Sequence, residues 1–162
     1  MNKELLLEDT WVFYSHLPHD TDWSLESYKR IYTFRNLKDM IVLIENIHKN
    51  LVKRCMLFIM KNDINPVWED KSNSNGGCFC FKIPENDIEL VWKMFVYKII
   101  GCDIDETIYK HINGISVSPK RKNCIIKVWM NTKEYKNADI FNSLFINSND
   151  NNGLFKPNVK SF

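Results

Sequence analysis

The chain has 162 residues, of which 44% are hydrophobic, and a formal net charge of +2. This length suits one domain with a proper core over 1–162, and the small net charge argues against non-specific binding of polyanions. No apolar run approaches the roughly 20 residues of a membrane-spanning helix and the N-terminus lacks a secretory signal, so we expect a soluble cytoplasmic protein without membrane contact.

The first third of the chain predicts two strands and one helix. Residues 1–10 are expected to form a loosely attached arm, and the WVFYS run from Trp11 to Ser15 is rich in strand formers. A polar loop that carries Trp23 follows, and RIYTF at 30–34 predicts a second strand. Apolar residues then recur at steps of three and four over 36–49, which indicates an amphipathic helix that starts at its N-cap asparagine.

The middle of the chain predicts two strands around a long loop, and then a second helix. CMLFIM at 55–60 is a continuous apolar run that suits a buried strand. The polar segment 61–77 contains Trp68 and Glu69 and ends in two glycines, which indicates a loop. CFCFKI then predicts a strand, and the apolar segment after it predicts a helix that ends at Gly101.

The last third predicts a hairpin, a third helix over 133–145 and a flexible C-terminal tail over 147–162. The strands GISVS and CIIKVWM flank a basic turn, PKRKN. Because strands and helices interleave with hairpins along the chain, the pattern favours an α+β domain with an antiparallel sheet.

Two tryptophans, Trp23 and Trp68, lie in polar, turn-like segments where no local pattern requires a core side chain. Taken alone, Trp23 also suits a loop anchor, whereas Glu69 and Asp70 make burial of the Trp68 segment costly. Two indole rings can sandwich a purine, and a carboxylate can accept hydrogen bonds from the N–H groups of guanine. A guanine methylated at N7 is positively charged and gains a cation–π term, so the pattern indicates a pocket for an mRNA cap.

Two other features permit more than one interpretation. Lys120, Arg121 and Lys122 form a basic cluster that, without further information, is an ordinary exposed hairpin tip. Trp129 alternates within IIKVW, which is typical of a core residue of a strand.

Signatures of catalysis and of metal binding are absent from the sequence. It contains no P-loop, no GxGxxG and no GxSxG motif. We therefore expect that the protein is not an enzyme and that it has no catalytic residue and no cofactor. His16 and His19 have no cysteine or acidic partner at metal spacing and are expected to be loop residues without a metal. The five cysteines include no CxxC pair and are expected to stay reduced; they stand at positions 55, 78, 80, 102 and 124.

The order of these residues resembles the eukaryotic translation initiation factor 4E family, whose members bind the 7-methylguanosine 5′ cap. The resemblance runs from Trp11 to about Phe145 and implies a curved antiparallel sheet with three helices on its convex face and a cap slot on its concave face. It rests on Trp11, Trp23, the PVWED run at Pro66 to Asp70, Gly76, Gly77, Trp92, Gly114 and Trp129.

The resemblance assigns roles to several residues of the slot. It implies that Trp23 and Trp68 stack on the base and that Glu69 accepts hydrogen bonds at its edge. Trp129 is placed near the N7 methyl group, a role that is compatible with a place in the core.

The basic turn also acquires a role from the resemblance. Lys120 and Lys122 fall on family positions that contact the cap phosphates, and Arg121 is an extra charge beside them.

The resemblance is weaker where family members receive a scaffold helix that carries a tyrosine and a leucine. In this region Leu37 is compatible, Ile41 replaces a tryptophan and Lys93 replaces an apolar leucine. These three residues are the expected partner contacts together with Trp92, which serves the family mainly in the core. These departures argue against the standard partner helix. We expect a scaffold of the initiation factor 4G type or a lineage-specific equivalent with altered anchors, for example an acidic residue facing Lys93.

The leading hypothesis is a monomeric cap-binding translation factor that ties capped mRNA to this scaffold. An alternative is a cap-sequestering repressor or decoy that does not bind the standard scaffold. A third hypothesis is a nucleotide-processing enzyme that holds its substrate in the same sandwich, which turnover of a cap analogue would reveal.

Overall fold

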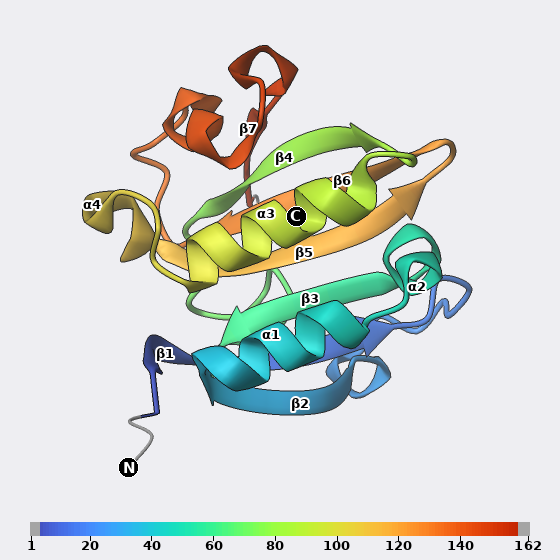
Figure 1. Cartoon of the computed structure of the whole chain (residues 1–162). Coiled ribbons are helices and arrows are strands. Elements are labelled where there is room, and N and C mark those ends of the chain that lie inside the picture. The colour runs from blue at the N-terminus through green and yellow to red at the C-terminus, as the bar shows by residue number, and fades with distance from the viewer. Residues whose placement is uncertain (1–3, 159–162) are drawn as a thin grey trace.

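A seven-stranded antiparallel sheet forms the centre of the computed structural model, which describes residues 4–158 (Figure 1). Its strands lie in the order β2-β1-β3-β5-β6-β4-β7, so β2 and β7 are the edges. The strand bounds are β1 Leu6–His16, β2 Lys29–Asn36, β3 Met56–Lys61, β4 Gly77–Pro84, β5 Ile112–Lys120, β6 Asn123–Met130 and β7 Leu154–Pro157.

Helices α1 (Leu37–Asn46) and α3 (Ile88–Ile100) lie across one face of the sheet (Figure 1). The side chain of Asn36 accepts a hydrogen bond from the backbone N–H of Asp39 at 2.7 Å, which confirms the predicted N-cap of α1. Two shorter helices are α2 (Lys49–Arg54) and α4 (Glu106–Tyr109). Within residues 4–158, no helix is long and apolar enough to cross a membrane.

Side-chain alternation along the strands gives the sheet two different faces. On β6, Ile126 and Val128 belong to the main core under the helices, together with the fully buried Trp11. Lys127 and Trp129 point to the opposite side, which we call the open face. The predicted α+β fold, a curved antiparallel sheet backed by helices, is confirmed.

The segment 133–145 differs from the predicted third helix. It contains a 3-10 helix over Ala138–Leu144 rather than an α-helix. Its buried residues Ala138, Phe141 and Leu144 recur at steps of three, which is the period of a 3-10 helix. These three side chains pack into the core from the same side of the 3-10 helix, so no α-helix is needed to bury them.

Near both ends, the described residues form more secondary structure than the sequence predicts. β1 begins at Leu6, which pairs with Asn36 on β2, so the expected arm over 1–10 is wrong from this residue onward. Within the expected tail over 147–162, a 3-10 helix spans Ser148–Asp150 and β7 pairs with β4. The remainder of this tail, residues 159–162, lies outside the described residues.

Candidate functional site

The open face carries an apolar cluster that is separate from the core under the helices. Two loops cover it: residues 17–28 between β1 and β2, and residues 62–76 between β3 and β4. These are the loops that hold the two tryptophans singled out from the sequence. The buried members of the cluster are Val12, Tyr14, Phe58, Met60, Cys78 and Trp129, with Tyr28, Met56, Ile64, Trp68 and Cys80 partly buried against them.

Trp23 is held in the first loop by a stack on one face of its indole. The other half of this stack is the His16 imidazole, with ring centroids 4.4 Å apart and an interplanar angle of 1°. The loop is folded by its own carboxylates, because the backbone N–H groups of Asp22 and Ser24 donate to Asp20 and Asp22 at 2.9 and 2.8 Å. Since 56% of the Trp23 side chain remains exposed, its second face is accessible to another flat ring.

His16 is fully buried at the end of β1, so the expectation that it is a loop residue is wrong, whereas His19 lies in the loop. Its Nε2 donates to the backbone carbonyl of Asp22 at 2.8 Å. Because a carbonyl only accepts, Nε2 carries a proton, and Nδ1 is buried without a partner among the described residues. The imidazole is therefore a fixed, flat platform beneath Trp23.

Aromatic contacts continue from this platform to the centre of the sheet. The Tyr28 ring lies 4.8 Å from His16 and 5.3 Å from Phe58, measured between centroids, and Phe58 lies 6.4 Å from Trp129. These spacings fall in the range of favourable aromatic pairs. The open face is thus an aromatic floor from the first loop to β6.

Trp68 lies in the second loop, as predicted, and packs partly buried against the open-face cluster. The Asp70 carboxylate folds this loop by accepting hydrogen bonds from the backbone N–H groups of Asn65 and Ser72 at 2.9 and 2.8 Å. The acidic residue beside Glu69 therefore organises the loop backbone and keeps the Trp68 indole against the sheet.

Buried Asn73 ties the second loop to distant parts of the chain. Its side-chain oxygen accepts a hydrogen bond from the Asn113 amide on β5 at 2.8 Å. Its backbone carbonyl accepts another from the side chain of Asn158, just after β7, at 2.9 Å. The loop is fixed at both positions rather than only at its ends.

Glu69 is an exposed residue of the second loop. Burial raises the pKa of the Tyr28 hydroxyl, and the nearby carboxylate of Glu69 raises it further. Tyr28 also contacts His16, on which Trp23 stacks, and Tyr28 packs with Trp68 against the open-face cluster. Trp23, Trp68 and Glu69 therefore belong to the two loops at this face. Their roles toward a nucleotide base remain predictions.

Trp129 is only 7% exposed, which confirms that it is a core residue of β6. Its Nε1 donates to the hydroxyl of Ser116 on β5 at 3.0 Å. Gly114 pairs with it across the strands, and a Cβ at this glycine would lie 2.8 Å from the backbone oxygen of Ile59, which leaves no room for a side chain. The contact of Trp129 with a methylated base stays a prediction.

The predicted basic cluster lies at the tip of the β5–β6 hairpin. Lys120 pairs with Asn123, and Arg121 and Lys122 form the turn between them. Arg121 has a φ of 58°, which suits a two-residue hairpin but costs a non-glycine residue about 1–2 kcal/mol. All three basic side chains are exposed, and their contact with phosphates stays a prediction.

Lys127 is a further basic residue of the open face that the sequence interpretation missed. It precedes Trp129 by two residues on the same face of β6 and pairs with Ser116 on β5 and Cys80 on β4. The alternation in IIKVWM contained this signal, because residues two apart in a strand share a face.

The cysteines and the acidic side chains offer no second centre. All five cysteines are free thiols, as predicted. In residues 4–158, no group of three or more His, Cys, Asp or Glu side chains could hold a metal ion.

The residues predicted to bind a scaffold lie on α1 and α3, away from the open face. Ile41 is 43% exposed, and Leu37 is partly buried against the core. Trp92 is only 1% exposed, so its prediction as a partner contact is wrong, and its ring fills the core under α3 instead. The surface available to a partner here is therefore narrower than the sequence predicts.

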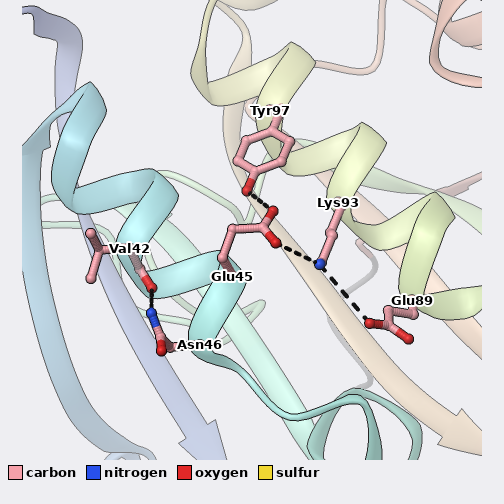
Figure 2. A network of polar contacts seen from close by, with 6 residues as sticks. All are labelled: Val42, Glu45, Asn46, Glu89, Lys93 and Tyr97. Carbon is pink, nitrogen blue, oxygen red and sulfur yellow. Dashed lines mark hydrogen bonds and ion pairs between the residues drawn. The ribbon is translucent and has the colours of Figure 1, made fainter.

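A polar network crosses this surface and joins α1 to α3 (Figure 2). Glu45 accepts hydrogen bonds from the Tyr97 hydroxyl and, at 3.0 Å, from the Lys93 ammonium group. Lys93 also lies 3.9 Å from Glu89. Lys93 therefore already faces two carboxylates of the protein itself, and an acidic partner residue opposite it stays a prediction.

The fold and the site define a class of protein: a curved antiparallel sheet backed by helices, with an aromatic open face and two loop tryptophans above it. The sequence profile of the family described as eukaryotic initiation factor 4E matches residues 6–150. The chain belongs to this family.

Relatives in sequence carry the same family name. The chain is 45% identical over 62 residues to the eukaryotic translation initiation factor 4E homolog of Acanthamoeba polyphaga mimivirus, which covers 37% of this chain and 23% of the viral protein. It is 25% identical over 147 residues to the Saccharomyces cerevisiae factor, which covers 80% of this chain and 68% of the yeast protein. A match to the Eremothecium gossypii factor is 36% identical and spans 51% of this chain and 38% of that protein.

Solved structures share the fold. Ascaris suum eIF4E-3 in complex with an m7G cap superposes with a TM-score of 0.82 at 18% identity, over 99% of this chain and 94% of the other. Caenorhabditis elegans eIF4E-3 in complex with the 4E-binding protein Mextli superposes with a TM-score of 0.72 at 19% identity, over 80% and 77% of the two chains.

Proposed function

We propose that this protein binds the 7-methylguanosine cap of mRNA on its open face and acts in translation initiation by linking the capped mRNA to a scaffold protein. The observation that carries the proposal is the Trp23 indole, stacked flat on His16 with its other face accessible. Trp68, followed by the exposed Glu69, packs on the open-face cluster from the second loop. Membership of the initiation factor 4E family supports it. The protein acts as a monomer in the cytoplasm, without a cofactor or a chemical step.

Base recognition divides between the indoles and the carboxylate. The rings of Trp23 and Trp68 stack on the two faces of the base, and the positive charge of an N7-methylated guanine strengthens both contacts. Glu69 accepts hydrogen bonds from N1–H and the exocyclic amine of guanine, a donor pair that adenine lacks. The exposed basic hairpin of Lys120, Arg121 and Lys122 neutralises the phosphates.

The direct test is a comparison of 7-methyl-GTP with GTP by quenching of intrinsic tryptophan fluorescence. The methylated nucleotide should bind more tightly, because only its base is a cation. Equal affinity for the two nucleotides would contradict the proposal.

The His16 platform gives a second, smaller prediction. His16→Ala should lower the affinity for 7-methyl-GTP by about 2- to 12-fold, since an aromatic pair contributes about 0.5–1.5 kcal/mol. His16→Phe keeps a flat ring under Trp23 and should bind nearly as the wild type does. If the alanine variant also bound like the wild type, the loop hydrogen bonds alone would position Trp23.

The polar network on α1 and α3 favours a second candidate function. A cap-sequestering repressor or decoy needs the open face but no standard scaffold. Ile41 offers less contact area than a tryptophan, and the ion-paired Lys93 would have to lose its hydration and partners under an apolar anchor. This surface is therefore a poor receptor for a tyrosine-and-leucine helix.

Titration with a standard scaffold peptide separates the two functions. We expect weak binding to the wild type and tighter binding to an Ile41→Trp, Lys93→Leu double variant, because both changes restore apolar contact. Glu89→Gln serves as a control for charge alone. Tight wild-type binding that the double variant does not improve would show an ordinary scaffold surface and remove the case for the decoy.

A further inference from the structure

A basic groove crosses the open face beside Trp129. It encloses about 350 Å³ between β4, the β5–β6 hairpin and β7. None of the described residues that line it is acidic. Its lysines, which we call the groove lysines, are Lys82, Lys120, Lys127 and Lys156.

Strand register places Lys156 in the same row as Trp129. β4 lies between β6 and β7, and Cys78 on β4 pairs with Trp129 on one side and with Lys156 on the other. Neighbouring strands are about 4.8 Å apart, so the two backbones are separated by about 10 Å. A ligand that touches Trp129 is therefore within reach of the long Lys156 side chain.

Two further groove lysines continue away from that row. Lys127 stands in the next row, opposite Cys80, and Lys82 stands in the row beyond, opposite Ile125. Residues two apart in a strand are separated by about 7 Å along the strand, so positive charges recur along the face at roughly that interval. Such a repeat suits a polyanion that runs across the sheet.

Within residues 4–158, the groove lysines form no ion pair with an acidic side chain of the protein. The ion pairs found in residues 4–158 involve Lys61 and Lys93 and none of the groove lysines. Burial raises the pKa of the Cys80 thiol, and the charges of Lys127 and Lys156 lower it in part. The ammonium groups of Lys127 and Lys156 therefore both act on the Cys80 thiol. They repel each other unless an anion lies between them.

We propose that Lys82, Lys127 and Lys156 of this groove bind the phosphodiester backbone of the first nucleotides that follow the cap, next to Lys120 at the cap phosphates. The inference rests on the proposed function, because it has the RNA enter the groove from Trp129. The lysine ammonium group is a compact charge and lacks the planar, two-pronged geometry of the arginine guanidinium. It therefore binds phosphates without contacting base edges, and the contact is independent of sequence. The groove would hold the RNA body while the aromatic floor holds the cap.

The test compares 7-methyl-GTP with a capped oligonucleotide of about eight residues, a length at which backbone contacts on one domain are complete. We expect the wild type to bind the capped oligonucleotide more tightly than the nucleotide, by a margin that shrinks with salt. A Lys82→Ala, Lys156→Ala double variant should lose this margin and retain its affinity for 7-methyl-GTP. Its salt slope should fall by about 0.7 for each lost phosphate contact.

Lys38 on α1 and Lys49 on α2 provide the matched control, because a double alanine variant there removes the same charge from the opposite side of the sheet. This control should bind both ligands like the wild type. An uncapped oligonucleotide of the same sequence separates backbone binding from cap binding.

The outcomes distinguish the two proposals. Absence of 7-methyl-GTP binding would overturn the proposed function itself. Normal 7-methyl-GTP binding with no gain from the attached RNA, or an equal loss in the control variant, would overturn the groove inference alone. Displacement of the capped RNA by an acidic peptide at lower concentration than by uncapped RNA would reassign the groove to a protein partner.

Discussion

Replacing Trp68 with alanine should remove most of the affinity for 7-methyl-GTP. Base stacking contributes about 1–3 kcal/mol per base, which corresponds to a loss of about 5- to 150-fold. Trp68→Phe should lose less, because a smaller aromatic face remains. Fluorescence titration measures both variants, with Trp23 as the remaining exposed reporter.

The same experiment should separate stacking from edge recognition. Glu69→Gln keeps the size of the side chain but replaces an acceptor by a donor, so the preference for guanine over adenine should fall while stacking remains. Because Glu69 is exposed and makes no hydrogen bond with its side chain within the described residues, this change should leave the melting temperature unaltered. Wild-type affinity in Trp68→Ala would place the base elsewhere on the open face.

The second large effect concerns Trp92, whose ring fills the core beneath α3. Trp92→Ala should lower the free energy of unfolding by about 3–5 kcal/mol, the usual cost of removing a large aromatic side chain from a core. Chemical denaturation followed by circular dichroism measures this loss.

Trp92→Phe is the matched control, because it removes less volume and also removes a buried Nε1 that has no partner in the described residues. We expect a much smaller loss for this variant. If Trp92→Ala kept its stability and lost only peptide binding, Trp92 would be a partner contact after all.

Local patterns carried most of the fold. Asn36 as a cap, the steps of three and four in α1, and the alternation around Trp129 each depend on near neighbours in sequence, so the structure agrees with them. The loop positions of Trp23, Trp68 and Glu69 were also predictable, because polar turn residues surround them.

The failures come from contacts between distant segments. Leu6 becomes part of β1 because it pairs with β2, and the four residues of β7 are a strand only because β4 lies beside them. His16 has the sequence environment of a loop residue, yet the rings of Trp23 and Tyr28 pack against it and bury it. Lys156 lies in the same row as Trp129 only because β4 pairs with both β6 and β7, so no local pattern could indicate the groove.

Asn73 makes the tryptophan-bearing loop and the last strand one cooperative unit. Its hydrogen bonds to Asn113 and Asn158 mean that the loop cannot open without loosening the end of β7. Thermodynamic linkage works in both directions, so a ligand that orders the loop also anchors the C-terminal edge of the sheet. Amide hydrogens of β7 should then exchange more slowly when 7-methyl-GTP alone fills the pocket, so the edge strand reports on the occupancy of a site in another loop.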